Sequence, residues 1–419
     1  MEFIQKLSSQ GISCNYGITD RFKTSFLSVD FVLPLSEENA SGMSLLAGVL
    51  FRGCNKYPQM KDISRYMARN YGVSLTISAN KVGEMELLSF CFSYLDSEYA
   101  IDGEDIRGAV VSLFKELLFH PLLQGDAFVE SYVEQEKTNL IDRITGLFND
   151  KRVYSMERCK ELMCKEEAYG INEMGSIEMV KSFTAASLYE FYKKLLNEAF
   201  VSLVYVGKDR ESFLENITEE FDAVGRVKPE TEVRYHCEAR EIVEPMELNQ
   251  SKLNLGFRLG NAAQQNQAAC RLFNVLYGGS ATSKLFMNVR ERLSLCYYCS
   301  STIDRFKNVM FVSSGVEASK YEEAKKEILA QLNAIVSGDF SEEEFQNAKA
   351  YWVDSVRSSL DSEGALASMM LAGTLQGDLK TPQQQIEEVE KVSREDVMDI
   401  AREVILDTVY FLKGVQHDA

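Results

Sequence analysis

The chain has 419 residues, of which 45% are hydrophobic and 26% charged, so it can bury sizeable cores in about two to four domains. Its formal net charge of −18 argues against nucleic-acid binding, because an acidic surface repels phosphates. No stretch approaches the roughly 20 apolar residues of a membrane span, and residues 1–6 lack the pattern of a signal peptide. The nine scattered cysteines are typical of reduced thiols. We therefore expect a cytoplasmic globular protein that binds neither nucleic acid nor membrane.

The first half of the chain alternates short apolar strands with amphipathic helices. Strands are predicted at 26–35, 73–79, 85–94 and 201–206. Helices are predicted at 43–51, 61–71, 105–118, 126–143, 153–165 and 186–195. Ser41, at the end of a predicted loop over 37–41, is the candidate N-cap of the first helix.

The second half repeats this alternation after an irregular, acidic stretch at 211–245, which is predicted to be a linker. Strands are predicted at 252–259, 296–302, 310–316 and 409–412. Helices are predicted at 268–277, 283–293, 320–337, 341–360, 365–375 and 394–406.

The two halves are an internal repeat. A shift of 226 residues aligns six apolar or glycine positions of the first half with the second: Phe31 with Phe257, Leu33 with Leu259, Leu46 with Leu272, Val49 with Val275, Phe51 with Tyr277, and Gly53 with Gly279. The repeat predicts an α+β protein of two homologous domains, each an antiparallel-rich sheet with helices packed against one face. The expected boundaries are 1–210, a linker at 211–245, and 246–419.

Residues 278–301 form the most distinctive motif of the chain. A glycine pair is followed by a helical pattern and then by a β-prone run: Gly278-Gly279, Ser283-Lys284-Leu285-Phe286, Arg290-Glu291 and Leu295-Cys296-Tyr297. This order resembles the second-domain signature of the inverzincin peptidases, which include insulin-degrading enzyme, pitrilysin and the mitochondrial processing peptidase. The resemblance covers nearly the whole chain and implies that Arg290 and Tyr297 contact the substrate backbone near the scissile bond. It also gives Gly278 and Gly279 a supporting role, because such small residues let the domain of a partner chain approach closely.

The first half lacks the zinc-binding motif of that family. Active members carry H-x-x-E-H on the first helix, and the family's usual continuation of this motif matches residues 49–53 here. This register places the two histidines at Ser44 and Gly48 and the general base at Ala47, with the third ligand at Arg143, or at Asp142 after a slip of one residue. Zinc needs nitrogen, sulfur or carboxylate donors. We therefore expect no metal and no catalytic residue in this chain.

Other metal or redox sites are also not predicted. Cys296 and Cys299 lie three apart in a predicted strand, where alternating side chains should point to opposite faces. Cys159 and Cys164 lie five apart on a predicted helix, which is unsuited to shared ligation. The three histidines are isolated in the sequence: His120, His236 and His417.

Some inverzincins act as two-chain peptidases, and this chain resembles the subunit that lacks zinc. The resemblance implies a non-catalytic, substrate-binding subunit that pairs with an H-x-x-E-H paralogue, with zinc only in the partner and a peptide as substrate. The alternatives are a stand-alone inactive peptide-binding protein, alone or as a homodimer, and a structural subunit of a larger complex. An edge strand near 73–79 is a candidate for binding a peptide by strand addition.

Overall fold

The computed structural model describes residues 1–209, 213–222 and 225–415. The chain divides into two compact units. Unit 1 contains Met1–Thr145, Ile171–Glu230 and Ser359–Thr381, and unit 2 contains Gly146–Gly170, Thr231–Ser358 and Pro382–Ala419. The expected domains at 1–210 and 246–419 follow chain order, whereas each unit includes one segment from the other half of the chain.

Unit 1 is built on a six-stranded sheet with the order β1-β2-β6-β3-β5-β4. Its strands are β1 Glu2–Leu7, β2 Ser13–Ile18, β3 Thr24–Pro34, β4 Ser74–Val82, β5 Met85–Leu95 and β6 Phe200–Gly207. All neighbours are antiparallel except β2 and β6, which run parallel. β4 is an edge strand, as the peptide-binding hypothesis requires.

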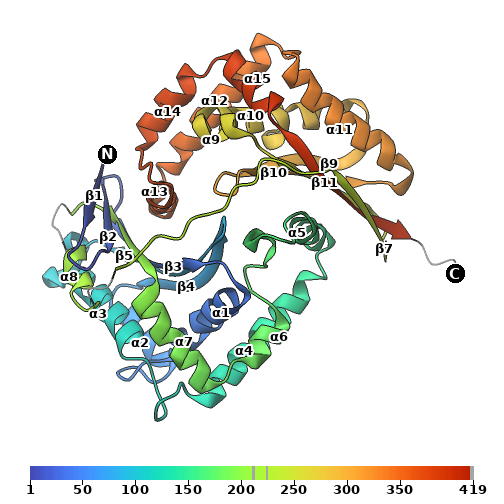
Figure 1. Cartoon of the computed structure of the whole chain (residues 1–419). Helices are drawn as coiled ribbons and strands as arrows, with labels where there is room; N and C mark the ends of the chain where they lie inside the picture. The colour runs from blue at the N-terminus through green and yellow to red at the C-terminus, as the bar shows by residue number, and fades with distance from the viewer. Residues whose placement is uncertain (210–212, 223–224, 416–419) are drawn as a thin grey trace. The chain divides into compact units, whose positions relative to one another are not determined.

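Helices cover the sheet of unit 1, and Figure 1 shows α1 and α7 beside it. The helices are α1 Glu37–Arg52, α2 Met60–Arg69, α3 Ile106–Phe119, α4 Glu130–Leu147, α6 Ile177–Ser182, α7 Ala185–Glu198, α8 Leu214–Thr218 and α13 Glu363–Gln376; α4 ends just beyond the unit boundary. The prediction that Ser41 caps the first helix is wrong. Ser36 is extended, and its side chain accepts a hydrogen bond from the Asn39 amide, so the helix begins at Glu37.

Unit 2 is built on a five-stranded sheet with the order β7-β11-β8-β10-β9. Its strands are β7 Arg240–Glu247, β8 Ser251–Arg258, β9 Cys296–Asp304, β10 Val309–Val316 and β11 Ile405–Val415. Its α-helices are α5 Lys151–Met163, α9 Asn261–Gln265, α10 Gln267–Asn274, α11 Tyr321–Val336, α12 Glu342–Ser359, α14 Pro382–Lys391 and α15 Arg394–Arg402. Two π-helical segments follow α10, at Val275–Gly279 and Leu285–Arg292. The first of these segments covers the end of the helix predicted at 268–277, and the second covers most of the helix predicted at 283–293.

The predicted duplication is confirmed by the topology of the two sheets. β8 occupies the central position of β3, and β11 lies beside it as β6 does in unit 1. The parallel pair β7–β11 matches the parallel pair β2–β6. The sequence did not predict β1, β2, β7, α6, α8, α9 or α14. Four of the six residues of the fully buried β2 are Ser, Cys, Asn and Gly, and Ile18 is its one β-branched residue.

Each sheet also carries one helix from the other half of the chain. α13 packs on β2, β3 and β6, where Met370 and Leu366 meet Val204 and Val206. α5 packs on β8 and β11, and its Met163 joins a cluster with Phe311 and Tyr410. The alternate side chains of β3, including Phe31, face the main core with α1 and α3. Helices therefore cover both faces of each sheet rather than one face alone.

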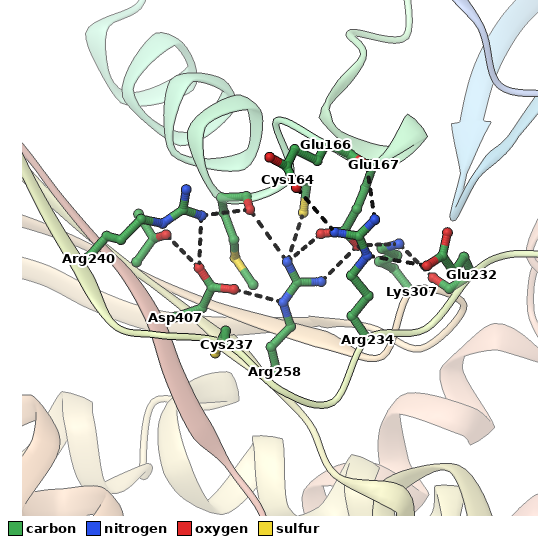
Figure 2. Close-up of polar contacts among 12 residues, drawn as sticks. Cys164, Glu166, Glu167, Glu232, Arg234, Cys237, Arg240, Arg258, Lys307 and Asp407 are labelled. Atoms are coloured by element: carbon green, nitrogen blue, oxygen red, sulfur yellow. Dashed lines mark hydrogen bonds and ion pairs between the residues drawn. The ribbon is translucent and has the colours of Figure 1, made fainter.

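A buried ion network binds the segment at 146–170 to the sheet of unit 2 (Figure 2). Glu167 accepts hydrogen bonds from both terminal nitrogens of Arg258, at 2.9 and 2.5 Å, and lies 2.6 Å from the ammonium of Lys307. The Arg258 Nε donates to Asp407 at 2.8 Å. The side chains of Glu167, Arg258, Lys307 and Asp407 are at most 3% exposed. Burial opposes ionisation of Glu167, but hydrogen bonds from Arg258 and Lys307 outweigh it and lower the pKa of Glu167.

Among the described residues, no helix combines the length and the apolar character that crossing a membrane requires.

Candidate functional site

The positions that correspond to the family's zinc site lie together in unit 1. Ser44, Ala47 and Gly48 are on one face of α1, and Arg143 is on the facing helix α4. All four line one cavity of about 620 Å³. Other residues of this cavity come from the edge strand β4 and from nearby helices and loops: Phe51, Arg52, Met60, Leu75, Thr76, Ile77, Ser78, Ala79, Glu136, Asn139, Glu173 and Met174.

The residues of this cavity do not fit a zinc ion. A Cβ added to Gly48 would meet the carboxylate of Glu136, which fills the space that a histidine at this position needs. Glu136 in turn accepts a hydrogen bond from Arg52 Nε at 2.6 Å, so its charge is already balanced by a cation of this chain. Ser44, Ala47 and Gly48 offer neither imidazole nor carboxylate, and the guanidinium of Arg143 repels a cation. Elsewhere in the described part of the chain, no group of three or more His, Cys, Asp or Glu side chains is arranged to hold a metal ion.

The predicted substrate-contact arginine lies on the π-helix Leu285–Arg292 of unit 2. Its guanidinium stacks on the Phe286 ring, 4.6 Å from the centroid, and lies 3.6 Å from Glu291. The Arg290 side chain keeps 39% of its surface exposed. π-Helical turns are rare and often occur at functional sites, because they shift the side chains that follow. The guanidinium of Arg290 is therefore held by Phe286 and Glu291 but remains partly exposed.

Tyr297 follows on the edge strand β9 and is 63% exposed. Among the described contacts, no hydrogen bond joins Tyr297 to Arg290, so the structure places the two near one strand end without linking them. Gly278 is buried, and a Cβ there would come within 2.6 Å of Ser301 Oγ on β9. A Cβ on Gly279 would meet Asn274 at 2.8 Å. The backbone of this glycine pair therefore lies close to β9 and to the end of α10 of the same chain.

The prediction that Cys296 and Cys299 point to opposite faces is wrong. Cys296 pairs with Val316 and Cys299 with Ser314, and the register shifts between these two pairs. The resulting β-bulge turns both cysteines toward the same core cluster. A bulge interrupts the regular alternation of side chains between the two faces of a strand. No residue pattern in this stretch indicates the bulge.

The structure also places a buried carboxyl group that the sequence did not indicate. Glu86 on β5 is 0% exposed, and neither of its oxygens has a hydrogen-bond partner among the described residues. Burial, with a smaller contribution from the charge of Glu173 on the cavity wall, raises the pKa of Glu86 to about 9. Glu86 is therefore a protonated acid at neutral pH.

We expect Glu86→Gln to stabilise the protein at pH 8 and to have little effect near pH 4.5. Between these values the unfolded chain releases the Glu86 proton while the folded chain keeps it, so stability falls as pH rises, by up to about 1.4 kcal/mol per pH unit. Glutamine is neutral throughout and removes this contribution. Urea unfolding of both proteins from pH 4.5 to 9 measures it, and an unchanged difference across this range would contradict the assignment.

Residues 182–352 match the family described as the peptidase M16 inactive domain. A relative from Bacillus subtilis (strain 168), "Probable inactive metalloprotease YmfF", is 32% identical over 99% of both chains. A second protein of that strain, "Uncharacterized zinc protease YmxG", is 22% identical over 88% of this chain and 93% of its own length. The crystal structure of a conserved protein from Enterococcus faecalis V583 has a TM-score of 0.89 and 26% identity, and covers 100% of both chains. The residues at the zinc positions of this chain do not fit a zinc ion. The chain therefore belongs to the M16 family of metallopeptidase-like proteins, the inverzincins, as a member of the inactive type.

Proposed function

We propose that this chain is the non-catalytic, substrate-binding subunit of a two-chain zinc-dependent endopeptidase. The observation that carries the proposal is the contrast between two sites of one chain. The zinc positions are Ser44, Ala47 and Gly48. In contrast, Arg290 on the π-helix Leu285–Arg292 and Tyr297 at the start of β9 are present and exposed. A partner that carries H-x-x-E-H would hold the zinc.

In this proposal Arg290 and Tyr297 act as hydrogen-bond donors. Donors that are aimed at a peptide carbonyl, and at the oxyanion that forms from it, lower the barrier to acyl transfer. Tyr297 is 63% exposed and the Arg290 side chain is 39% exposed, so a substrate backbone can approach both. The presence of an inactive-type relative and a zinc-protease relative in one Bacillus subtilis strain supports the pairing of two such chains.

The alternative function is peptide binding without cleavage, by this chain alone or as a homodimer. The cavity of about 620 Å³ in unit 1 favours it, because β4 borders the cavity as an edge strand, and an extended peptide can pair with a sheet edge. In this alternative Arg290 and Tyr297 have no catalytic task.

Zinc content and peptidase activity of the purified chain, alone and mixed with an H-x-x-E-H paralogue from the same organism, separate these functions. The proposal expects no stoichiometric zinc and no cleavage of a fluorogenic peptide library by this chain alone. It expects cleavage by the mixture that clearly exceeds cleavage by the paralogue alone. Peptide binding without any gain in cleavage would support the alternative, and stoichiometric zinc with cleavage by this chain alone would contradict both.

A further inference from the structure

The β-bulge of β9 brings two thiols together at the start of the strand. Cys296 and Cys299 face the same core cluster, within hydrogen-bond reach of each other and of Ser314. We propose that Cys296 and Cys299 are a disulfide-forming dithiol that a low-molecular-weight organic disulfide oxidises by thiol–disulfide exchange. The thiol chemistry of this site does not depend on the function proposed above.

The backbone geometry of the bulge suits a disulfide. Three steps along β9 lie opposite only two steps along β10, from Val316 to Ser314. Two strand steps span about 6.6 Å, so the Cα atoms of the two cysteines are drawn to about the same separation. Disulfides join Cα atoms about 4.4 to 6.8 Å apart, whereas three regular strand steps of about 10 Å are too long. The bulge therefore turns an unsuitable spacing into a suitable one.

The two thiols also differ in the way that exchange requires. Cys296 is 9% exposed and Cys299 is 3% exposed, so Cys296 is the more accessible sulfur. The Cys299 thiol donates to the Cys296 sulfur and, with smaller help from Ser314 and Arg290 against burial, lowers the pKa of Cys296 to about 7. The hydrogen bond to Cys296 raises the pKa of Cys299. Cys296 is thus the attacking thiolate and Cys299 the resolving thiol.

The exchange proceeds in two balanced steps. The Cys296 thiolate attacks one sulfur of the small disulfide, breaks its S–S bond and releases one small thiolate. The Cys299 sulfur then attacks Cys296 in this mixed disulfide and releases the second small thiolate. The two cysteines lose two electrons and two protons, and the small disulfide gains them as two small thiols.

Closure of this disulfide would act on Tyr297, which lies between the two cysteines in the sequence. The S–S bond would fix the bulge and thereby the backbone from which the exposed phenol projects. Only this consequence rests on the proposed function, since there Tyr297 contacts the substrate.

The test uses the whole reduced chain, equilibrated at pH 7.5 in glutathione buffers of increasing oxidised fraction, then acid-quenched, alkylated and digested for mass spectrometry. We expect a disulfide between Cys296 and Cys299, whereas the other seven cysteines should remain reduced and therefore be found alkylated. Iodoacetamide should modify Cys296 in the reduced chain at least about tenfold faster than Cys159, because the thiolate is the reacting form. Cys299→Ser should instead trap one glutathione on Cys296.

Cys159 and Cys164 provide a control within the same chain. Both are buried in one cluster at the end of α5, and burial raises the pKa of Cys164 to about 12 and that of Cys159 further. This pair should remain reduced throughout. The proposal is overturned if Cys296 and Cys299 stay reduced in fully oxidised glutathione, if glutathione accumulates on wild-type Cys296 without resolution, or if Cys159 and Cys164 oxidise equally well. The wild-type measurement decides even if Cys299→Ser fails to fold.

Discussion

Replacing Arg290 by alanine should lower kcat/KM of the two-chain enzyme for peptide cleavage about 100-fold, which corresponds to about 2.7 kcal/mol of lost transition-state stabilisation. The loss of activity is expected to come from hydrogen bonds to the substrate, because the contacts of the guanidinium with Phe286 and Glu291 lie at a partly exposed surface and contribute little to stability. The thermal midpoint of this chain should change little, because the side chain is 39% exposed.

Tyr297→Phe should lower kcat/KM in the same assay by about tenfold or more, because it removes one hydroxyl donor and keeps the ring. Two neighbouring residues provide matched controls. Arg292→Ala changes an exposed arginine on the same π-helix, and Tyr298→Phe changes the next residue of β9, which packs under the Arg152 guanidinium. Both controls should retain activity.

Full activity of the mixture with Arg290→Ala and Tyr297→Phe combined would contradict the proposed function. The pair would then be dispensable, as expected for a structural subunit. Equal losses in the Arg292→Ala and Tyr298→Phe controls would instead assign the effect to the local packing of β9.

Glu167→Gln should destabilise unit 2 by about 3–5 kcal/mol, the usual effect of removing one partner of a buried ion pair. Glu167 is the carboxylate shared by Arg258 and Lys307, and the Lys307 side chain is 0% exposed. The neutral amide preserves the shape of Glu167 but removes the negative charge that faces both buried cations, while the carboxylate of Asp407 stays paired with Arg258 (Figure 2). Urea unfolding, with hydrogen exchange of α5 as a local probe, measures the effect.

Glu166→Gln is the matched control for this prediction, because it makes the same change one residue earlier. The Glu166 side chain is 87% exposed and lies 4.0 Å from Arg234, so its loss should change stability by less than about 0.5 kcal/mol. If both variants lose the same stability, the buried network does not hold α5. Because the hydrogen bonds from Arg258 and Lys307 outweigh burial and lower the pKa of Glu167, its contribution to stability is present above the pKa of the unfolded chain and is lost as pH falls through the lowered value.

Local periodicity identified most of the elements, because apolar spacing is a property of neighbouring residues. Strands such as β3 and β8 and helices such as α11 lie close to their predicted ranges. The missed strand β2 carries mainly small and polar residues, and it is buried through pairing with β6, which is distant in sequence. The π-helical turns around Gly278 and Arg290 were also missed, since their hydrogen bonds depend on how β9 packs against them.

The sequence likewise predicted some features of the candidate site, whereas others became visible only in the fold. The identity of Ser44, Ala47 and Gly48 was sufficient to predict that zinc has no ligands here, because ligand chemistry belongs to the side chains themselves. The sequence did not indicate that Glu136 fills the space beside Gly48 and is paired with Arg52, because these residues meet only when α4 packs against α1. The buried Glu86 also required the fold, since burial is a property of all the surrounding strands.

The sequence by itself determined the duplicated α+β fold, the inverzincin signature at Arg290 and Tyr297, and the loss of the zinc ligands, because these follow from spacing and residue chemistry. Only the tertiary structure decided that α5 and α13 pack on the sheet of the opposite half, that Arg258 and Glu167 form a buried ion pair, and that Cys296 and Cys299 share one face. Each of these depends on contacts between distant segments or on one bulge, and a strand pattern read along the chain contains neither.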